Sequence, residues 1–262
     1  MIRAVLLALV LALAACAQQP RVLKVCADPN NLPFSNARGE GFENKLAELA
    51  ARELGARLEY VWWAQRRGYV RNTLRAGECD LWPGVASQLE ILGTTRPYYR
   101  STYVFLTRAD RGLDVASLDD PRLKTLKVGV QLVGDDGANT PPSHALTRRG
   151  IISNVRGYTL YGDYGAPNPP AAIVEAVDRG EVDVAIVWGP LAGYFAQRAA
   201  HPLRIRPVTP WLDGPQWPMV FDISMGVRKD DAELRQALDR ILEARRAEVR
   251  GLLESYGVPS AD

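Results

Sequence analysis

The chain has 262 residues, of which 47% are hydrophobic and 24% are charged, and its formal net charge is +2. This length accommodates one large or two modest domains with real hydrophobic cores, and the composition is that of an ordinary soluble globular protein. The arginines are scattered among acidic residues and form no basic run, so nothing in the sequence indicates a nucleic-acid partner.

The first 17 residues predict an export signal rather than a part of the fold. Arg3 precedes an apolar run at residues 4–15 that is too short to span a bilayer. Residues 13–16 resemble a bacterial lipobox, in which Cys16 becomes the lipidated first residue. Residues 15–17 also fit the small-x-small site of an ordinary signal peptidase. We favour the lipoprotein route because the segment is so short, and both routes predict a periplasmic protein.

Processing leaves Cys26 and Cys79 in a chain bound for an oxidising compartment. Both residues fall in strands that we expect to be neighbours, so we predict a Cys26–Cys79 disulfide, with two buried free thiols as the alternative. The sequence has no CxxC motif and only two histidines, His144 and His201. A structural zinc site is therefore not expected, and neither is a cofactor.

The first third of the mature chain alternates strands and helices. Phe42, Leu46 and Leu49 recur at helical spacing, and Gly55 then closes that helix. The expected elements are a strand at 22–27, a loop at 28–36, a helix at 42–54, a strand at 58–63, a helix at 66–76 and a strand at 79–85. This alternation predicts a parallel sheet with helices on its faces. The loop at 28–36 lies at the carboxyl end of its strand, where open parallel sheets bind ligands, and an ordinary connection shaped by its prolines is the alternative.

A second set of elements repeats the first. Residues 75–81 (RAGECDL) are echoed by residues 178–184 (DRGEVDV), where a helix again ends at glycine and leads into a strand. The expected elements before and around this echo are a strand at 126–133, a loop and helix at 134–149, a strand at 155–161, a helix at 171–179 and a strand at 182–188. The sequence therefore predicts two βαβαβ lobes.

Two extended segments connect these lobes. Residues 96–106 are rich in aromatic and β-branched side chains and predict a crossover strand, and residues 218–227 predict the return. A helix from Asp231 to Tyr256 follows, capped by Asp230 or Asp231 and stopped at Gly257. We expect it to pack on the first lobe. The predicted boundaries are residues 21–108 with 213–262 for the first lobe, and 109–212 for the second, with a two-strand hinge and a cleft between them.

Over nearly its whole mature length, the sequence resembles the periplasmic type II solute-binding proteins that serve amino-acid ABC transporters. The motifs that carry this resemblance are KVCAD at 24–28, GFE at 41–43, AGECD at 76–80 and RPYY at 96–99. Longer segments, such as CADPNNLPFSN at 26–36 and DVAIVWGPLAGYFA at 183–196, resemble the J-protein branch (MoxJ or XoxJ type) encoded beside quinoprotein methanol dehydrogenases. The resemblance implies a monomeric, non-catalytic binding protein of the periplasmic-binding-protein type II fold.

The sequence departs from the amino-acid receptors at both ends of their ligand clamp. Those receptors typically bind the ligand carboxylate with an arginine just after the third strand, where this chain has Ser-Gln-Leu-Glu-Ile at 87–91. They bind the ammonium group with an acidic residue where this chain has Trp188. Each lost charge-assisted hydrogen bond removes about 1.5–3 kcal/mol of interaction. A free amino acid is therefore not the expected ligand.

The remaining candidate residues are mostly aromatic and amide side chains, which suit a peptide, a protein surface or a flat ligand. The candidate cleft residues are Asn30, Asn31, Phe34, Trp63, Arg66, Trp82, Arg96, Tyr98, Tyr99, Gln131, Asp135 and Trp188. Each tryptophan has an alternative role in packing between sheet and helix, and Arg96 has one as a surface residue.

Three function classes follow from these observations. The first is an accessory protein that binds or helps mature a PQQ-dependent methanol dehydrogenase. The second is a receptor that delivers a small molecule other than a standard amino acid to an ABC permease. The third is an enzyme, which would need an acid and a base in the cleft; Asp135, Asp136, Asp163 and Asp222 are available but form no recognisable catalytic motif. We therefore expect a non-enzymatic protein.

Overall fold

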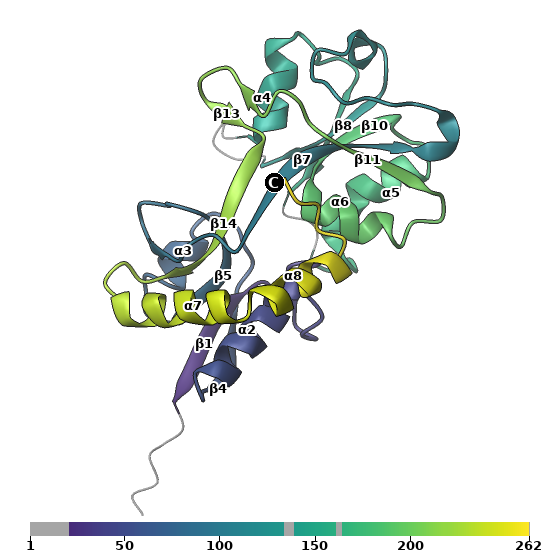
Figure 1. Ribbon diagram of the computed structural model, residues 1–262. Helices are drawn as coiled ribbons and strands as arrows, with labels where there is room; N and C mark the ends of the chain where they lie inside the picture. Colours follow the sequence, from purple (N-terminus) through teal and green to yellow (C-terminus); the bar gives the residue numbers. More distant parts are fainter. Residues whose placement is uncertain (1–20, 134–138, 161–163, 262) are drawn as a thin grey trace, which may run out of the picture.

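A computed structural model describes residues 21–133, 139–160 and 164–261 (Figure 1). The predicted export signal with Cys16 lies outside these residues, as do Asp135, Asp136 and Asp163. Within the described ranges, no helix is both long and apolar enough to cross a membrane.

Three parallel strands form the first lobe's part of the sheet, in the order β4-β1-β5. The elements of this lobe's first chain segment are β1 (Val22–Ala27), β2 (Asn30–Asn31), β3 (Ser35–Asn36), α2 (Phe42–Glu53), β4 (Arg57–Trp62), α3 (Tyr69–Asn72), β5 (Leu81–Ala86) and β6 (Gly93–Thr94). Helix α2 packs on the sheet through Phe42, Leu46 and Leu49, which are buried in one core with Val25 of β1. The predicted helix at 42–54 is confirmed.

The second lobe repeats this arrangement, with parallel strands in the order β10-β8-β9. Its elements are η1 (Ala109–Arg111), η2 (Pro121–Lys124), β8 (Val128–Leu132), α4 (Pro141–Arg148), β9 (Val155–Thr159), η3 (Pro169–Ala171), α5 (Ala172–Asp178), β10 (Val184–Trp188), α6 (Gly189–Ala196) and β11 (Leu203–Pro207). The segment that returns to the first lobe then forms β12 (Leu212–Asp213) and β13 (Trp217–Pro218). Buried side chains on both faces of this sheet form two cores, one under α5 and α6 and one under α4. The predicted fold of two βαβαβ lobes is confirmed.

The turns that suggested the repeat have the same conformation in both lobes. Gly77 and Gly180 both have positive φ values, +77° and +72°, which favour glycine. Each turn then leads into the third strand of its lobe.

The aspartates of the repeated turns also make the same hydrogen bonds. The Asp80 amide donates to the Lys24 carbonyl, and the Asp80 carboxylate accepts from the Lys24 amide at 3.0 Å. In the second lobe the Asp183 amide donates to the Lys127 carbonyl, and the Asp183 carboxylate accepts from the Lys127 amide at 2.8 Å. The sequence echo therefore reflects one local structure that ties the first strand to the third in each lobe.

Two long antiparallel strands connect the lobes, β7 (Tyr99–Arg108) and β14 (Val220–Val227). The first half of β7 pairs with β14 between Tyr99 and Thr102, and its second half pairs with β10 and β11. The far end of β14 pairs with β5. The two predicted crossovers are therefore confirmed, and they continue one sheet through both lobes (Figure 1).

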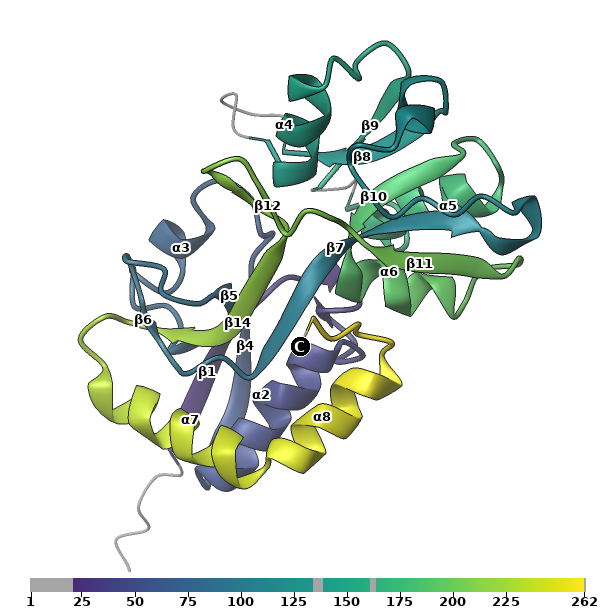
Figure 2. The same ribbon diagram turned by 45° about the horizontal axis from the view of Figure 1, so that its top comes forward.

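The chain ends in two helices rather than the single helix predicted at 231–256. They are α7 (Ala232–Ala244) and α8 (Arg246–Ser255), and Asp231 caps the first by accepting from the Leu234 amide at 3.1 Å. Arg245, with φ −107° and ψ 19°, leaves the helical region. The bend there keeps both Leu242 and Val249 in the first-lobe core. Figure 2 shows α8 beside α2, so the end of the chain completes the first lobe as expected.

Two other helices are shorter than predicted. The helix expected at 66–76 is limited to Tyr69–Asn72, because Gly68 before it is left-handed and the Thr73 hydroxyl donates to the Tyr69 carbonyl at 2.6 Å. The helix expected within 134–149 begins at Pro141, since a residue before proline disfavours the helical region. The first of these two helices, α3, borders the cleft described below.

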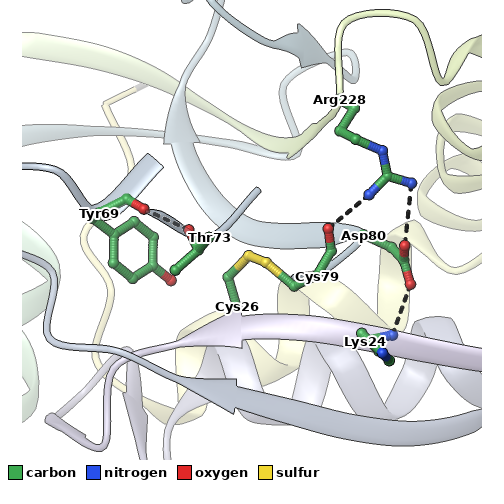
Figure 3. Close-up of a disulfide and its surroundings, with 7 residues drawn as sticks. All are labelled: Lys24, Cys26, Tyr69, Thr73, Cys79, Asp80 and Arg228. Atoms are coloured by element: carbon green, nitrogen blue, oxygen red, sulfur yellow. Dashed lines mark hydrogen bonds and ion pairs between the residues drawn. A yellow bond between two sulfur atoms is a disulfide. The ribbon is translucent and has the colours of Figure 1, made fainter. Parts of the chain in front are cut away.

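The predicted Cys26–Cys79 disulfide is present (Figure 3). It joins β1 to the turn before β5, and the two Cα atoms lie 5.6 Å apart, within the range that a disulfide spans. Both cysteines are fully buried, in a small core that includes Tyr69 and Leu74. The Arg228 guanidinium donates to the Cys79 carbonyl at 2.8 Å, which attaches this turn to the end of β14.

Candidate functional site

A cavity of about 640 Å³ lies between the two lobes. Its walls come from the carboxyl ends of β1, β5, β8 and β10, from the starts of α2 and α3, and from the crossover strands. The predicted residues that line it are Asn30, Asn31, Phe34, Arg66, Trp82, Tyr99, Gln131 and Trp188. The structure thus brings together residues from both lobes that are more than 150 positions apart in the chain, such as Asn30 and Trp188.

Three predicted residues lie outside this cavity. Trp63 follows the edge strand β4, and 44% of its surface is exposed. Arg96 and Tyr98 face a different hollow, formed with α7 and α8. The Arg96 amide donates to the Asp239 carboxylate at 2.7 Å, and the Tyr98 hydroxyl donates to the Pro83 carbonyl at 2.9 Å. These contacts turn both residues toward the first-lobe core and the terminal helices.

An aromatic cluster from the crossover strands forms one wall of the cavity. Tyr103 of β7 lies 5.3 Å from Trp188 of β10, centroid to centroid, and Phe221 of β14 lies 5.8 Å from Trp188. Both pairs meet edge to face, the geometry that aromatic rings prefer. The sequence indicated Trp188 but missed Tyr103 and Phe221, because their orientation depends on the register between β7 and β14.

The start of α2 carries Glu43 into the cavity. The Glu43 amide donates to the Phe34 carbonyl at 2.9 Å, and Gly41 allows this approach because a Cβ there would lie 1.9 Å from the same oxygen. The loop at 28–36 therefore rests on the helix start. Only 4% of Glu43 is exposed, and its carboxyl lies against Gly84, where a Cβ would be 2.0 Å from Oε1.

Burial raises the pKa of Glu43 to about 8, and the nearby Asp28 carboxylate adds to this effect. No described residue donates a hydrogen bond or pairs with this carboxyl group. At neutral pH Glu43 is therefore mainly a neutral acid that can both donate and accept a hydrogen bond. Sequence reasoning missed its role, because an acid in the first turn of a helix also favours the helix start.

Two further polar atoms beside the cavity have no hydrogen-bond partner among the described residues, the Tyr69 hydroxyl and the Trp82 indole nitrogen. Their rings are 5.0 Å apart. Burial raises the pKa of Tyr69, and the Gln65 side chain offsets this only in part without reaching hydrogen-bond geometry. Buried polar groups are normally paired, so unpaired ones at a cavity indicate where a ligand or water would bind.

Contacts between the lobes cross the cleft beside these groups. The fully buried Asp28 carboxylate accepts hydrogen bonds from the Gln65 amide at 2.7 Å and from the Tyr164 hydroxyl at 2.5 Å. The Asn30 carboxamide donates to the Ala166 carbonyl at 2.9 Å, and the Arg66 guanidinium lies 4.8 Å from the centre of the Tyr164 ring. Tyr164 therefore links the second lobe to the loop that follows β1.

Within residues 21–133, 139–160 and 164–261, no group of three or more His, Cys, Asp and Glu side chains is placed to hold a metal ion. Asp222, considered above as a catalytic acid, lies in the hollow beside α7 and α8 and pairs with Arg100 at 3.6 Å. The cavity lining consists of aromatic side chains and a few polar groups that a ligand could contact.

Comparisons with known proteins agree with this geometry. A family model described as bacterial extracellular solute-binding proteins, family 3, matches residues 23–257. The chain is 36% identical over 249 residues to the protein MoxJ of Methylorubrum extorquens, covering 90% of this chain and 81% of that protein. It is 32% identical over 256 residues to MoxJ of Paracoccus denitrificans, covering 90% and 88%.

A solved structure also resembles the chain closely. The periplasmic binding protein XoxJ from Methylobacterium extorquens AM1 superimposes with a TM-score of 0.75 at 36% identity, and the match covers 92% of this chain and 100% of that chain. The similarity therefore extends over both lobes and the terminal helices.

Proposed function

The chain belongs to family 3 of the bacterial extracellular solute-binding proteins, and we propose from this premise that it is a periplasmic, non-catalytic accessory protein for a PQQ-dependent methanol dehydrogenase. The observation that carries this proposal is its similarity to MoxJ and XoxJ along both lobes. Its sequence also resembles the J-protein branch encoded beside such dehydrogenases. The binding surface in this proposal is the cleft with its aromatic wall.

The absence of the two charged residues that hold an amino acid supports a role other than amino-acid binding. Residues 87–91 contain no arginine, and Trp188 directly precedes α6, where an amino-acid receptor would use an acid. A cleft without these charges loses its specificity for a zwitterion, and aromatic side chains are common in protein interfaces.

Association with the dehydrogenase tests the proposal. The purified protein is mixed with the dehydrogenase in its apo, holo and partly unfolded forms, and complexes are measured by size-exclusion chromatography with light scattering. We expect a complex with at least one form. An amino-acid receptor of the same family serves as the control, since it shares the fold but keeps the clamp. Absence of a complex with all three forms would overturn the proposal.

A second candidate function is a solute receptor for an ABC importer. The observation that favours it is the cavity itself, whose volume of about 640 Å³ suits a small molecule. Native mass spectrometry of the protein isolated from the periplasm distinguishes the two functions. A retained small molecule with binding to a permease supports the receptor, and a retained dehydrogenase supports the accessory protein.

Export and lobe boundaries are part of the same proposal. We place the first lobe at residues 21–108 with 213–262 and the second at 109–212, and we propose that Cys16 carries lipid. The mass of the mature protein tests the lipid directly, since a chain that starts elsewhere or lacks a diacylglyceryl group excludes it.

A further inference from the structure

The polar side chains that line the cavity differ in their exposure to solvent, and the uncharged ones are more buried than the arginines. Glu43 and Tyr69 are both buried at one end, with Trp82 half-buried beside them. Arg71 and Arg75, which also line the cavity, are exposed and come from the α3 segment at its mouth. Aromatic rings, among them Tyr103, Trp188 and Phe221, line other parts of the cavity.

The buried end offers uncharged hydrogen-bond partners. The Tyr69 hydroxyl and the Trp82 indole nitrogen have no partner among the described residues. Glu43 stands beside them, and the ionisable groups coupled to it are Asp28 after the end of β1, with the phenols of Tyr69, Tyr98 and Tyr99. None of these groups is a cation, so no described side chain favours an ionised Glu43, which remains a donor at neutral pH. A hydroxyl or carbonyl oxygen of a ligand would satisfy this end.

The mouth offers positive charge without counter-ions. Within the described residues, no carboxylate lies within 4.0 Å of Arg71 or Arg75, although arginines elsewhere, such as Arg52 and Arg149, are paired with acids. Arg66 lies over the Tyr164 ring at the same mouth. Guanidinium groups bind carboxylates through paired hydrogen bonds, so an anionic group fits here.

We propose that the cavity binds a planar aromatic carboxylate that carries a hydroxyl or carbonyl oxygen at the end opposite its carboxylate. The oxygen reaches Tyr69, Trp82 and Glu43, the ring lies among the aromatic walls, and the carboxylate meets Arg71 and Arg75. This inference rests on the proposed function only in treating the cleft as the binding site of a non-catalytic protein. A small molecule fits better than a polypeptide segment because the unpartnered polar atoms belong to buried or half-buried side chains, and the cavity of about 640 Å³ has the size of a small-molecule site.

Three naphthalene probes test the two ends separately by isothermal titration calorimetry. 6-Hydroxy-2-naphthoate has both groups, 2-naphthoate lacks the hydroxyl, and 2-naphthol lacks the carboxylate. We expect 6-hydroxy-2-naphthoate to bind most tightly, and each missing group to weaken binding about tenfold. The carboxylate contribution falls as salt concentration rises, because the arginines are exposed.

Matched variants assign the effect to residues. Arg71→Gln with Arg75→Gln removes the advantage of 6-hydroxy-2-naphthoate over 2-naphthol, whereas Arg240→Gln, at an exposed arginine of α7 outside the cavity, changes affinity less than twofold. Tyr69→Phe with Trp82→Phe removes the advantage of the 6-hydroxyl group. Melting curves of each variant confirm that it is folded.

Each result decides the inference. An affinity for 6-hydroxy-2-naphthoate no higher than that for 2-naphthoate or for 2-naphthol, or an unchanged advantage of 6-hydroxy-2-naphthoate over 2-naphthol in the double arginine variant, overturns it. No binding of any probe, together with a dehydrogenase complex that the arginine variant loses, assigns the cavity to a polypeptide and also overturns it. Probe binding without any dehydrogenase complex supports the ligand class and overturns only the proposed function.

Discussion

The Tyr164 hydroxyl donates a hydrogen bond of 2.5 Å to Oδ2 of Asp28, and this bond joins the second lobe to the loop after β1. The same carboxylate is held in place by the amides of Asn30 and Gln65. The Asp28 carboxylate is therefore held in position by contacts within the first lobe alone. Tyr164 is the second lobe's contribution to this contact.

Tyr164→Phe is expected to shift the protein toward a more open arrangement of its lobes. It removes a hydrogen bond to a buried carboxylate, an interaction of about 1.5–3 kcal/mol. Small-angle scattering measures the change as a larger radius of gyration. Tyr158→Phe is the matched control, because the Tyr158 hydroxyl has no hydrogen-bond partner among the described residues. Equal scattering from both variants would contradict the role of this contact.

Glu43→Gln is expected to stabilise the protein at neutral pH. The pKa of Glu43 is about 8 in the fold, against an ordinary value of 4.5. Below pH 4.5 the Glu43 carboxyl is protonated in both the folded and unfolded states, so its ionisation does not change the free energy of unfolding. Between about pH 4.5 and 8 only the unfolded state releases it, and wild-type stability falls by about 1.4 kcal/mol per pH unit relative to the variant. Above pH 8 the difference levels off.

Denaturant unfolding of wild type and Glu43→Gln across pH 4 to 9 measures this difference. Glu78→Gln, at an exposed turn position, serves as the control and is expected to show no such slope. A constant difference between wild type and Glu43→Gln over this range would show that the pKa of Glu43 is the same in the folded and unfolded states, which contradicts the prediction.

Replacing both cysteines, Cys26→Ala with Cys79→Ala, is expected to lower the free energy of unfolding by about 4 kcal/mol. The disulfide closes a loop with a sequence separation of 53, and restricting a loop of this length in the unfolded chain accounts for that magnitude. Wild type treated with reductant should unfold at the same denaturant concentration as the double variant. A double variant as stable as the oxidised wild type would contradict the expectation.

Leu238→Ala is expected to destabilise the protein by about 3 kcal/mol, because this fully buried side chain of α7 packs in the first-lobe core. Chemical denaturation measures the loss. Gln236→Ala, an exposed position of the same helix, is expected to have little effect. Equal losses from the two variants would show that α7 is not part of this core.

Standard amino acids are expected to leave the melting temperature unchanged at millimolar concentration. Binding to the folded state alone would raise it, and the cleft lacks both charges that hold a zwitterion. A rise that depends on concentration with any one amino acid would contradict this.

The fold could be predicted from sequence largely because its signals are local. Glycines after helices and the repeated aspartate turns recur in both lobes, and the two cysteines fall beside neighbouring strands. The site could be predicted only in part. Glu43 and Tyr69 look like ordinary helix residues, and their place in the cavity depends on how the loop at 28–36 and α3 pack. The orientation of Tyr103 and Phe221 is set by pairing between strands 120 residues apart, which no local pattern encodes.

The interleaved chain path of the first lobe has a consequence for the order of folding during synthesis. Its core contains Val25 and Phe42 from the beginning of the chain and Leu238 and Val249 from the end. The second lobe, by contrast, draws its cores from residues that are contiguous in the middle of the chain, apart from single residues such as Leu32 and Tyr256. Because the chain emerges from its amino terminus, nearly all residues of the second-lobe cores are available before the terminal helices of the first lobe. The core of the first lobe is complete only when the last helices have been added.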